Sequence, residues 1–386
     1  MRSGKSQVIA TTLVVTALLC TGCKPVENSL STLSVDEENA NTTTFKMFQP
    51  IAIKSIDQAS DLVSEDVKEV IEYAQQVKVG IVNDNYQSSN KSLISKLTNE
   101  LTLELSNIVI ETVTPEMDNV NSYLNSVHDL IAKGVQVVLI PNQMYEKDLE
   151  PIIKNYPDIV FVTLDSFIHA PNVLGLKFRD ESSAFLAGVI AAAQSSTQRV
   201  LYLGYEENKQ LNQIHFQGFE AGARAVNEEI VVNQSYLSQN ASSAEIKEKV
   251  RSLYQEEYDI IFEDLNAHQQ DVISIAKEYT TFHHPVWVIN SALHLSNQVE
   301  EWQAEPVILS STVKNIDVAL CNVLNNLLNG NLVLGTQIIL GLENNGVDVT
   351  LTGQGLREST TDLVQLYKEK IINGEIVVPT SLKALD

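Results

Sequence analysis

The stretch that most constrains the fold is residues 199–236, where a strand, a helix and a second strand are predicted in succession. An apolar run at 200–203 reads as a buried strand, and a β-branched run at 230–232 reads as another. Between them, after a polar loop, apolar residues including Phe216 recur at helical spacing. Because such a unit joins parallel strands, the sequence predicts an α/β fold with a parallel sheet. Ligands bind these sheets at the carboxyl ends of the strands, where the polar loop begins.

Three positions indicate how the predicted helices begin, end and pack. Gly218 and Gly222 lie four residues apart on one helix face, where missing side chains would let the helix lie close to the sheet. Asp180 precedes a predicted helix at 181–194, and aspartate is a favoured N-cap residue. Gly134 follows another predicted helix in the usual C-terminal position.

The alternation of strands and helices continues on both sides of this unit and predicts two doubly wound lobes. A chain of 386 residues has room for two such cores. We expect a ligand cleft between the lobes and hinge closure around the ligand. Further strands are predicted at 79–82, 108–113, 135–140, 159–164, 259–262, 286–289 and 307–309. The predicted parts are a signal peptide at 1–22, a lipidated N-terminus, tether and lead-in helix at 23–77, an N-terminal lobe from 78–172 with 306–350, and a second lobe from 173–305 with a hinge-crossing tail at 351–386.

The N-terminal segment has the pattern of an export signal. A positively charged start is followed by an apolar stretch at 8–19, which is too short to span a bilayer comfortably. Residues 19–23 (LCTGC) resemble a bacterial lipobox, although Cys20 stands where leucine is usual. This resemblance predicts lipidation at Cys23, with a plain secretory signal as the alternative. We therefore expect a membrane-anchored protein of the bacterial cell envelope whose folded part lies outside the cytoplasm.

Net charge and cysteine content further limit the classes of protein to which this chain can belong. The formal net charge of −23 argues against nucleic acid, whose phosphates would be repelled. Once the signal peptide is removed, Cys23 and Cys321 remain, and the first is predicted to carry lipid. Cys321 lies in a strongly apolar helical pattern, so a buried structural thiol is expected.

Several short motifs, in a shared order along residues 78–380, resemble one known family. The chain is similar to the basic-membrane-protein family of bacterial substrate-binding lipoproteins, whose characterised members bind nucleosides for ABC transporters. The resemblance implies a type I periplasmic-binding fold. The motifs are YPDIVF at 156–161, FRDESSAFLAG at 178–188, FQGFEAG at 216–222, LSSTVKNID at 309–317 and LGLENNGV at 340–347.

The ligand pocket that this resemblance implies is retained only in part. Where the family carries a phenylalanine that stacks on the base and an aspartate that binds ribose, this chain has Ser89 and Ala292. Tyr86 is a neighbouring ring that could replace the first, with an ordinary loop tyrosine as the alternative. The resulting candidate ligand-binding residues are Asp84, Tyr86, Ser88, Asn90, Phe216 and Lys314.

Catalytic and metal-binding motifs are missing from the sequence. It contains no His-Glu-x-x-His, Cys-x-x-Cys, Gly-x-Ser-x-Gly or phosphate-binding P-loop motif. His268 with Asp264 and Asp271 is a weak metal alternative to ordinary solvated loop residues. We therefore predict no enzyme activity, no metal and no cofactor.

Two functions fit this sequence. The first is a monomeric solute-binding lipoprotein that closes its lobes on a small ligand, nucleoside-like or otherwise polar, and delivers it to an ABC permease. The second is a ligand-sensing or interaction lipoprotein that signals to an envelope partner without transport. Retention of Phe216 and Lys314 favours the first.

Overall fold

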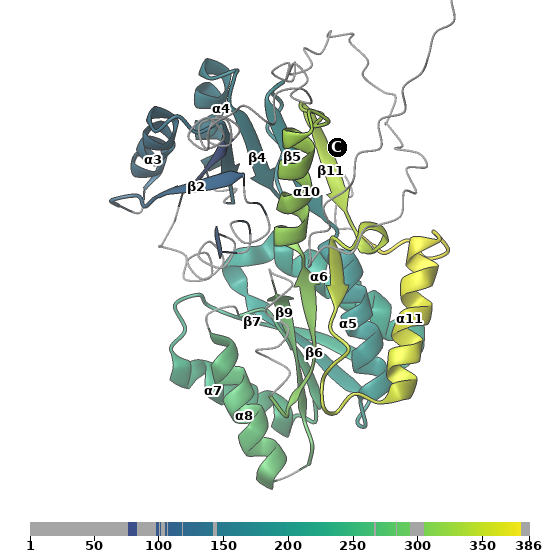
Figure 1. Ribbon diagram of the computed structural model, residues 1–386. Coiled ribbons are helices and arrows are strands. Elements are labelled where there is room, and N and C mark those ends of the chain that lie inside the picture. Colours follow the sequence, from purple (N-terminus) through teal and green to yellow (C-terminus); the bar gives the residue numbers. More distant parts are fainter. Residues whose placement is uncertain are drawn as a thin grey trace, which may run out of the picture. The chain divides into compact units, whose positions relative to one another are not determined.

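The computed structural model describes residues 76–82, 98–99, 101, 105, 107–117, 119–141, 145–265, 268–282, 284–293 and 305–379. These residues form two six-stranded sheets with helices between and around the strands (Figure 1). The predicted fold class, an α/β protein with two doubly wound and mainly parallel sheets, is confirmed. Among these described residues, no helix is both long enough and apolar enough to cross a membrane.

The first sheet is entirely parallel. Its inner strands are short and mostly apolar, as expected where both faces of a parallel sheet are covered. In spatial order they are β11 (Thr336–Leu340), β5 (Val173–Phe178), β4 (Val160–Leu164), β3 (Val137–Ile140), β1 (Val77–Val82) and β2 (Ile108–Val113).

The second sheet is parallel except for its last strand, which pairs antiparallel with its neighbour. In spatial order its strands are β12 (Val347–Val349), β10 (Ile308–Lys314), β9 (Trp287–Leu293), β8 (Ile260–Glu263), β6 (Arg199–Tyr205) and β7 (Val231–Leu237). The predicted unit at 199–236 is therefore confirmed as β6, a helix and β7.

The helices follow the strands as a doubly wound fold requires, and Gly134 ends the first of them with a positive φ of 77°. They are α3 (Val120–Ala132), α4 (Glu146–Asn155), α5 (Asp180–Gln194), α6 (Lys209–Val226), α7 (Ser243–Gln255), α8 (Gln269–Phe282), α10 (Ile316–Leu328) and α11 (Glu358–Ile372). Short 3-10 helices occupy Glu206–Asn208 and Leu342–Asn344.

The two faces of the second sheet pack against different helices. Phe262 and Ile289 belong to the core that includes α5 and α6. Their neighbours Ile261 and Val288 point to the other face, where the core includes α7 and α8. Cys321 of α10 is buried in the first of these cores, as predicted. Alternate residues of each strand thus face different surroundings, which matters for the polar residues at the strand ends.

The predicted role of the paired glycines was wrong in one respect. Gly218 and Gly222 face helix α5 rather than the sheet. A Cβ on Gly218 would lie 2.4 Å from the carbonyl oxygen of Glu181, and one on Gly222 would lie 1.9 Å from that of Phe185. Gly188 of α5 approaches α6 in the same way. The glycines therefore bring two helix backbones into contact, and a side chain at these positions would force them apart.

The sheets divide the chain differently from the predicted lobe boundaries. Strand β5 was assigned to the second lobe, but it pairs with β4 and β11 in the first sheet. Strands β10 and β12 lie within 306–350, which was assigned to the N-terminal lobe, but both belong to the second sheet. Each of these strands is short, and the pattern of a short strand does not specify which sheet it joins.

Candidate functional site

Two of the predicted ligand-binding residues lie in the described part of the chain. Phe216 is half-buried in α6, with its ring centroid 6.3 Å from that of Tyr202. Lys314 ends strand β10. The other four candidates, and the predicted lipid-bearing residue, lie outside the described residues: Asp84, Tyr86, Ser88, Asn90 and Cys23.

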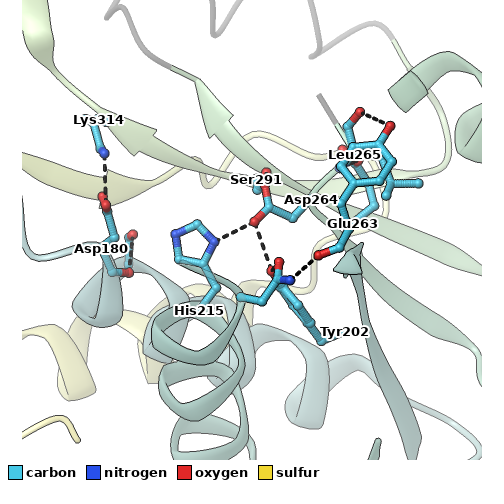
Figure 2. Close-up of polar contacts among 11 residues, drawn as sticks. Asp180, Tyr202, His215, Glu263, Asp264, Leu265, Ser291 and Lys314 are labelled. Carbon is cyan, nitrogen blue, oxygen red and sulfur yellow. Dashed lines mark hydrogen bonds and ion pairs between the residues drawn. The ribbon is translucent and has the colours of Figure 1, made fainter. Parts of the chain in front are cut away.

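Lys314 joins the two sheets through a pair of carboxylates. Its Nζ donates to Asp165 Oδ2 and to Asp180 Oδ2, both at 2.8 Å. Asp165 follows β4 of the first sheet, whereas β10 belongs to the second. Asp180 opens α5, the helix that connects the two sheets, and its contact with Lys314 is drawn in Figure 2. This three-residue cluster places three charges where the chain passes from one sheet to the other.

The carboxylates keep Lys314 charged despite its burial. Burial alone would lower the pKa of Lys314, but Asp165 and Asp180 together raise it above its ordinary value. Burial alone would likewise raise the pKa of Asp165, and the charge of Lys314 lowers it below its ordinary value. The expectation that Asp180 acts as an N-cap was wrong. The N-cap residue is Arg179, and the Asp180 side chain is turned to Lys314 because a cation offers a stronger bond than a backbone N–H.

A second polar cluster surrounds Asp264, the residue directly after β8. Its Oδ2 lies 2.8 Å from Nδ1 of His215 and accepts from the Tyr202 hydroxyl at 2.9 Å. Its Oδ1 accepts from Ser291 Oγ at 2.5 Å. These groups come from α6, β6 and β9 and converge on one carboxylate, as Figure 2 shows. All four residues are buried.

The partners of Asp264 determine its charge. Burial would raise its pKa, but the charge and hydrogen bond of His215, with the hydroxyls of Ser291 and Tyr202, lower it to about 2. For His215, burial lowers the pKa and the Asp264 carboxylate outweighs this effect, so the pKa lies above its ordinary value. The pair is therefore a buried ion pair at the carboxyl end of the second sheet, next to Phe216.

The residues around Asp264 differ from the predicted combination. The weak metal alternative grouped it with His268 and Asp271, but Asp264 turns toward His215 instead. His268 pairs with Asp271 at 3.0 Å. Among the described residues, no group of three or more potential ligands could hold a metal ion. The position of Asp264 directly after a buried strand was the available signal, because polar residues at such ends form sites in parallel sheets.

Solved structures with the same fold include a solute-binding protein and a transcriptional activator. An ABC transporter solute-binding protein from Aeropyrum pernix K1 matches with a TM-score of 0.63 and 16% identity, over 80% of this chain and 94% of that one. A transcriptional activator of the comK gene from Bacillus halodurans matches with a TM-score of 0.65 and 18% identity, over 78% of this chain and 99% of that one. The fold is thus the type I periplasmic-binding fold.

The family is equally clear from the sequence. The model of the Bmp family, described as ABC transporter substrate-binding protein PnrA-like, matches residues 80–381. The chain belongs to this family, and the predicted resemblance is confirmed. It is therefore a substrate-binding protein of an ABC transporter rather than an enzyme, and its folded part belongs to an extracytoplasmic class.

Two relatives illustrate the range of the family. Basic membrane protein A of Borreliella burgdorferi (strain ATCC 35210 / DSM 4680 / CIP 102532 / B31) is 26% identical over 72% of this chain and 80% of its own length. The ABC transporter nucleoside-binding protein BmpA of Lactococcus lactis subsp. cremoris (strain MG1363) is 28% identical over 59% of this chain and 66% of its own length.

Proposed function

We propose that this protein is a lipid-anchored receptor that binds a nucleoside or a closely similar solute and delivers it to its membrane permease. The observation that carries the proposal is the placement of charged groups at the carboxyl ends of strands, where parallel sheets bind ligands. Lys314 ends strand β10 of the second sheet, and Asp165 follows strand β4 of the first. Asp264 follows β8, another strand of the second sheet. The name of the relative from Lactococcus lactis supports a nucleoside as the ligand.

The surroundings of Phe216 and Lys314 support their predicted roles. The Phe216 ring is half-buried near the Tyr202 ring, and a ring held in this way offers a face on which a base can stack. Lys314 is held by two carboxylates, which fix its Nζ at the junction of the sheets. A ligand oxygen placed there would receive a charge-assisted hydrogen bond. Asp84, Tyr86, Ser88 and Asn90 remain proposed contributors from the first lobe.

A ligand screen on the full-length chain in detergent tests this function. Adenosine, guanosine, inosine, cytidine and uridine would be compared with free sugars and amino acids by thermal shift. A nucleoside at a hundred times its dissociation constant stabilises the folded chain by about 2.7 kcal/mol. A response to sugars or amino acids alone would contradict the proposed ligand class.

Single substitutions then test the two residues. Phe216→Ala and Lys314→Met are expected to weaken nucleoside binding about tenfold or more. Lys368→Met is a matched control, because Lys368 is also partly buried and pairs with one carboxylate, Asp348. This control is expected to leave the affinity unchanged. Equal losses in Lys314→Met and Lys368→Met would indicate a general effect on folding.

The proposed anchor requires a separate measurement. Cells expressing the chain would be labelled with a radioactive fatty acid, and the chain would be recovered from membranes. Cys23→Ser is expected to abolish the label, whereas Cys20→Ser is expected to retain it. Label retained in Cys23→Ser would contradict lipidation at that residue.

A further inference from the structure

Three neighbouring strands of the second sheet carry polar residues that lie side by side and are fully buried, one at the last residue of β8 and the others within β9 and β10. Glu263 of β8 is in register with Asn290 of β9, and Asn290 is in register with Ser311 of β10. Each has zero exposed area. Neighbouring strands lie about 4.8 Å apart, so the three side chains form a continuous row across the sheet.

This row lies on the opposite face from the Asp264 cluster. Side chains alternate along a strand, so Glu263 shares its face with Ile261, and Asn290 shares its face with Val288. Both apolar residues belong to the core that includes α7 and α8. Asp264 and Ser291, the next residues along, point to the α6 side and bond to each other. The row is thus separate from the residues assigned above.

The polar atoms of the row are not used within the described part of the chain. Glu263 Oε1, both amide atoms of Asn290 and the hydroxyl of Ser311 are buried and lack a hydrogen-bond partner there. Glu263 Oε2 accepts from the backbone N–H of Leu265, which fixes the direction of the carboxyl group. Each unpaired buried polar group costs about 1–3 kcal/mol, so a row of them in the native fold requires an explanation.

We propose that Glu263, Asn290 and Ser311 bind an uncharged part of the solute that carries both hydrogen-bond donors and acceptors. Hydroxyls of a sugar and the edge of a nucleobase both have this chemistry. The inference rests on the proposed function and adds the residues that would read the solute from the second sheet. Asparagine and serine side chains each donate and accept, so they suit a neutral polar group.

The state of Glu263 agrees with a neutral ligand group. Burial raises the pKa of Glu263 to about 8, an effect that the Leu265 N–H reduces but does not cancel. At neutral pH the carboxyl group is therefore mostly protonated and can donate one hydrogen bond. An anionic ligand group would meet acceptor oxygens and no cation within this row, whereas a cationic group would release the proton of Glu263.

Matched substitutions in the full-length chain separate a binding role from a structural one. Asn290→Leu and Ser311→Ala remove side-chain atoms that have no partner among the described residues, so the melting temperature without ligand is expected to stay the same or rise. Affinity for adenosine or inosine, measured by calorimetry, is expected to fall about tenfold or more. Glu263→Gln keeps a neutral donor and acceptor and is expected to stay within about threefold of the wild-type affinity.

The controls use partnered residues of the same types. Ser310 Oγ donates to the carbonyl oxygen of Thr350 at 2.7 Å, and Asn172 donates to three backbone carbonyls. Ser310→Ala and Asn172→Leu are therefore expected to lower the melting temperature and leave the affinity unchanged. A binding site is expected to give opposite results in the two pairs of variants. Asn290→Leu and Ser311→Ala lose affinity, whereas Ser310→Ala and Asn172→Leu lose stability.

Two ligand comparisons identify which part of the solute is bound. If the row reads sugar hydroxyls, Ser311→Ala weakens binding of adenosine but not of 2′,3′-dideoxyadenosine. If it reads the base edge, both ligands are weakened equally. Calorimetry in buffers of different ionisation enthalpy is expected to show no net proton release at pH 6. Release of about one proton would indicate a cationic group and would overturn the inference.

The results also separate this inference from the proposed function. If the wild type binds a nucleoside and Asn290→Leu and Ser311→Ala bind it equally well, the inference fails and the function stands. If the wild type binds no nucleoside, the proposed ligand class fails, and the melting temperatures without ligand decide the inference. A lower melting temperature in Asn290→Leu would then overturn it, and a higher one would support it.

Discussion

Glu263 and Asp264 are adjacent and both buried, yet their pKa values are shifted in opposite directions. Burial raises the pKa of Glu263 to about 8, whereas His215 and two hydroxyls lower that of Asp264 to about 2. Because side chains alternate along a strand, the two carboxyl groups face different sides of the sheet. The comparison shows that burial alone does not determine the charge of a carboxyl group. The hydrogen-bond donors on the same side of the sheet decide whether the carboxyl group is charged.

The two sides also differ in what they leave for a ligand. On the α6 side, Asp264 is surrounded by donors supplied by the chain, so this cluster holds strands and helix in a fixed relation (Figure 2). On the other side, Glu263, Asn290 and Ser311 keep donors and acceptors that no residue in the described part of the chain uses. We interpret the first cluster as a support for the site and the second as part of the site itself.

Removing the carboxylate of Asp264 is expected to have the largest effect on stability. Asp264→Ala leaves His215 and Ser291 buried without this acceptor, and the Tyr202 hydroxyl keeps only Asn212 Oδ1. Breaking a buried ion pair in this way costs about 3–5 kcal/mol. The free energy of unfolding would be measured by chemical denaturation. A loss below about 1 kcal/mol would show that the cluster is not a buried ion pair.

Lys314→Met extends the comparison to a cluster made of charges alone. The substitution leaves Asp165 and Asp180 facing each other without their cation. Because these side chains retain a little exposure, we expect a loss of about 2–3 kcal/mol, somewhat less than for a fully buried pair. Denaturation at low and high salt would check this value. Lys314→Arg, which keeps the charge, is expected to recover part of the loss.

Glu263→Gln tests the neutral carboxyl group through pH. The folded-state pKa of Glu263 lies above its unfolded value, so the folded chain holds a proton that the unfolded chain releases. Its contribution to stability is present below pH 4.5 and is lost as pH rises toward 8. The stability of Glu263→Gln relative to wild type is therefore expected to increase by at least about 1.4 kcal/mol between pH 5 and pH 8. Parallel stability curves for the two proteins would contradict a neutral Glu263.

The smallest effect is expected at the surface counterpart of the His215–Asp264 pair. His268 Nδ1 lies 3.0 Å from Asp271 Oδ2, but the His268 side chain is 32% exposed. Solvent screens this contact, so His268→Ala is expected to cost less than about 1 kcal/mol. His215→Ala, measured alongside, is expected to cost several times more. Similar losses in the two variants would remove the distinction between buried and exposed pairs.

Much of the local structure could be read from the residue pattern. The helix predicted at 181–194 matches α5 within one residue, and a capping box formed by Ser242 and Glu245 begins α7. The strand predicted at 108–113 matches β2, and the βαβ unit matches β6, α6 and β7. Periodicity and capping act between residues close in sequence, so these features are encoded locally. The family and its ABC-transporter role also followed from ordered motifs.

The contacts between distant segments could not be read in this way. Lys314 was singled out, but its partners Asp165 and Asp180 lie 149 and 134 residues away. Nothing in the local pattern links them. Similarly, Gly218 and Gly222 were correctly read as a close-packing face, but the sequence did not show that α5 was the neighbour.

What the sequence alone determined is thus the succession of strands and helices, the α/β class and the family. The tertiary structure decided which sheet each short strand joins, and which side of the second sheet Glu263 and Asp264 face. It also decided which polar atoms find partners. The physical reason is that hydrogen bonding and burial at these positions depend on register between strands that are far apart in the chain.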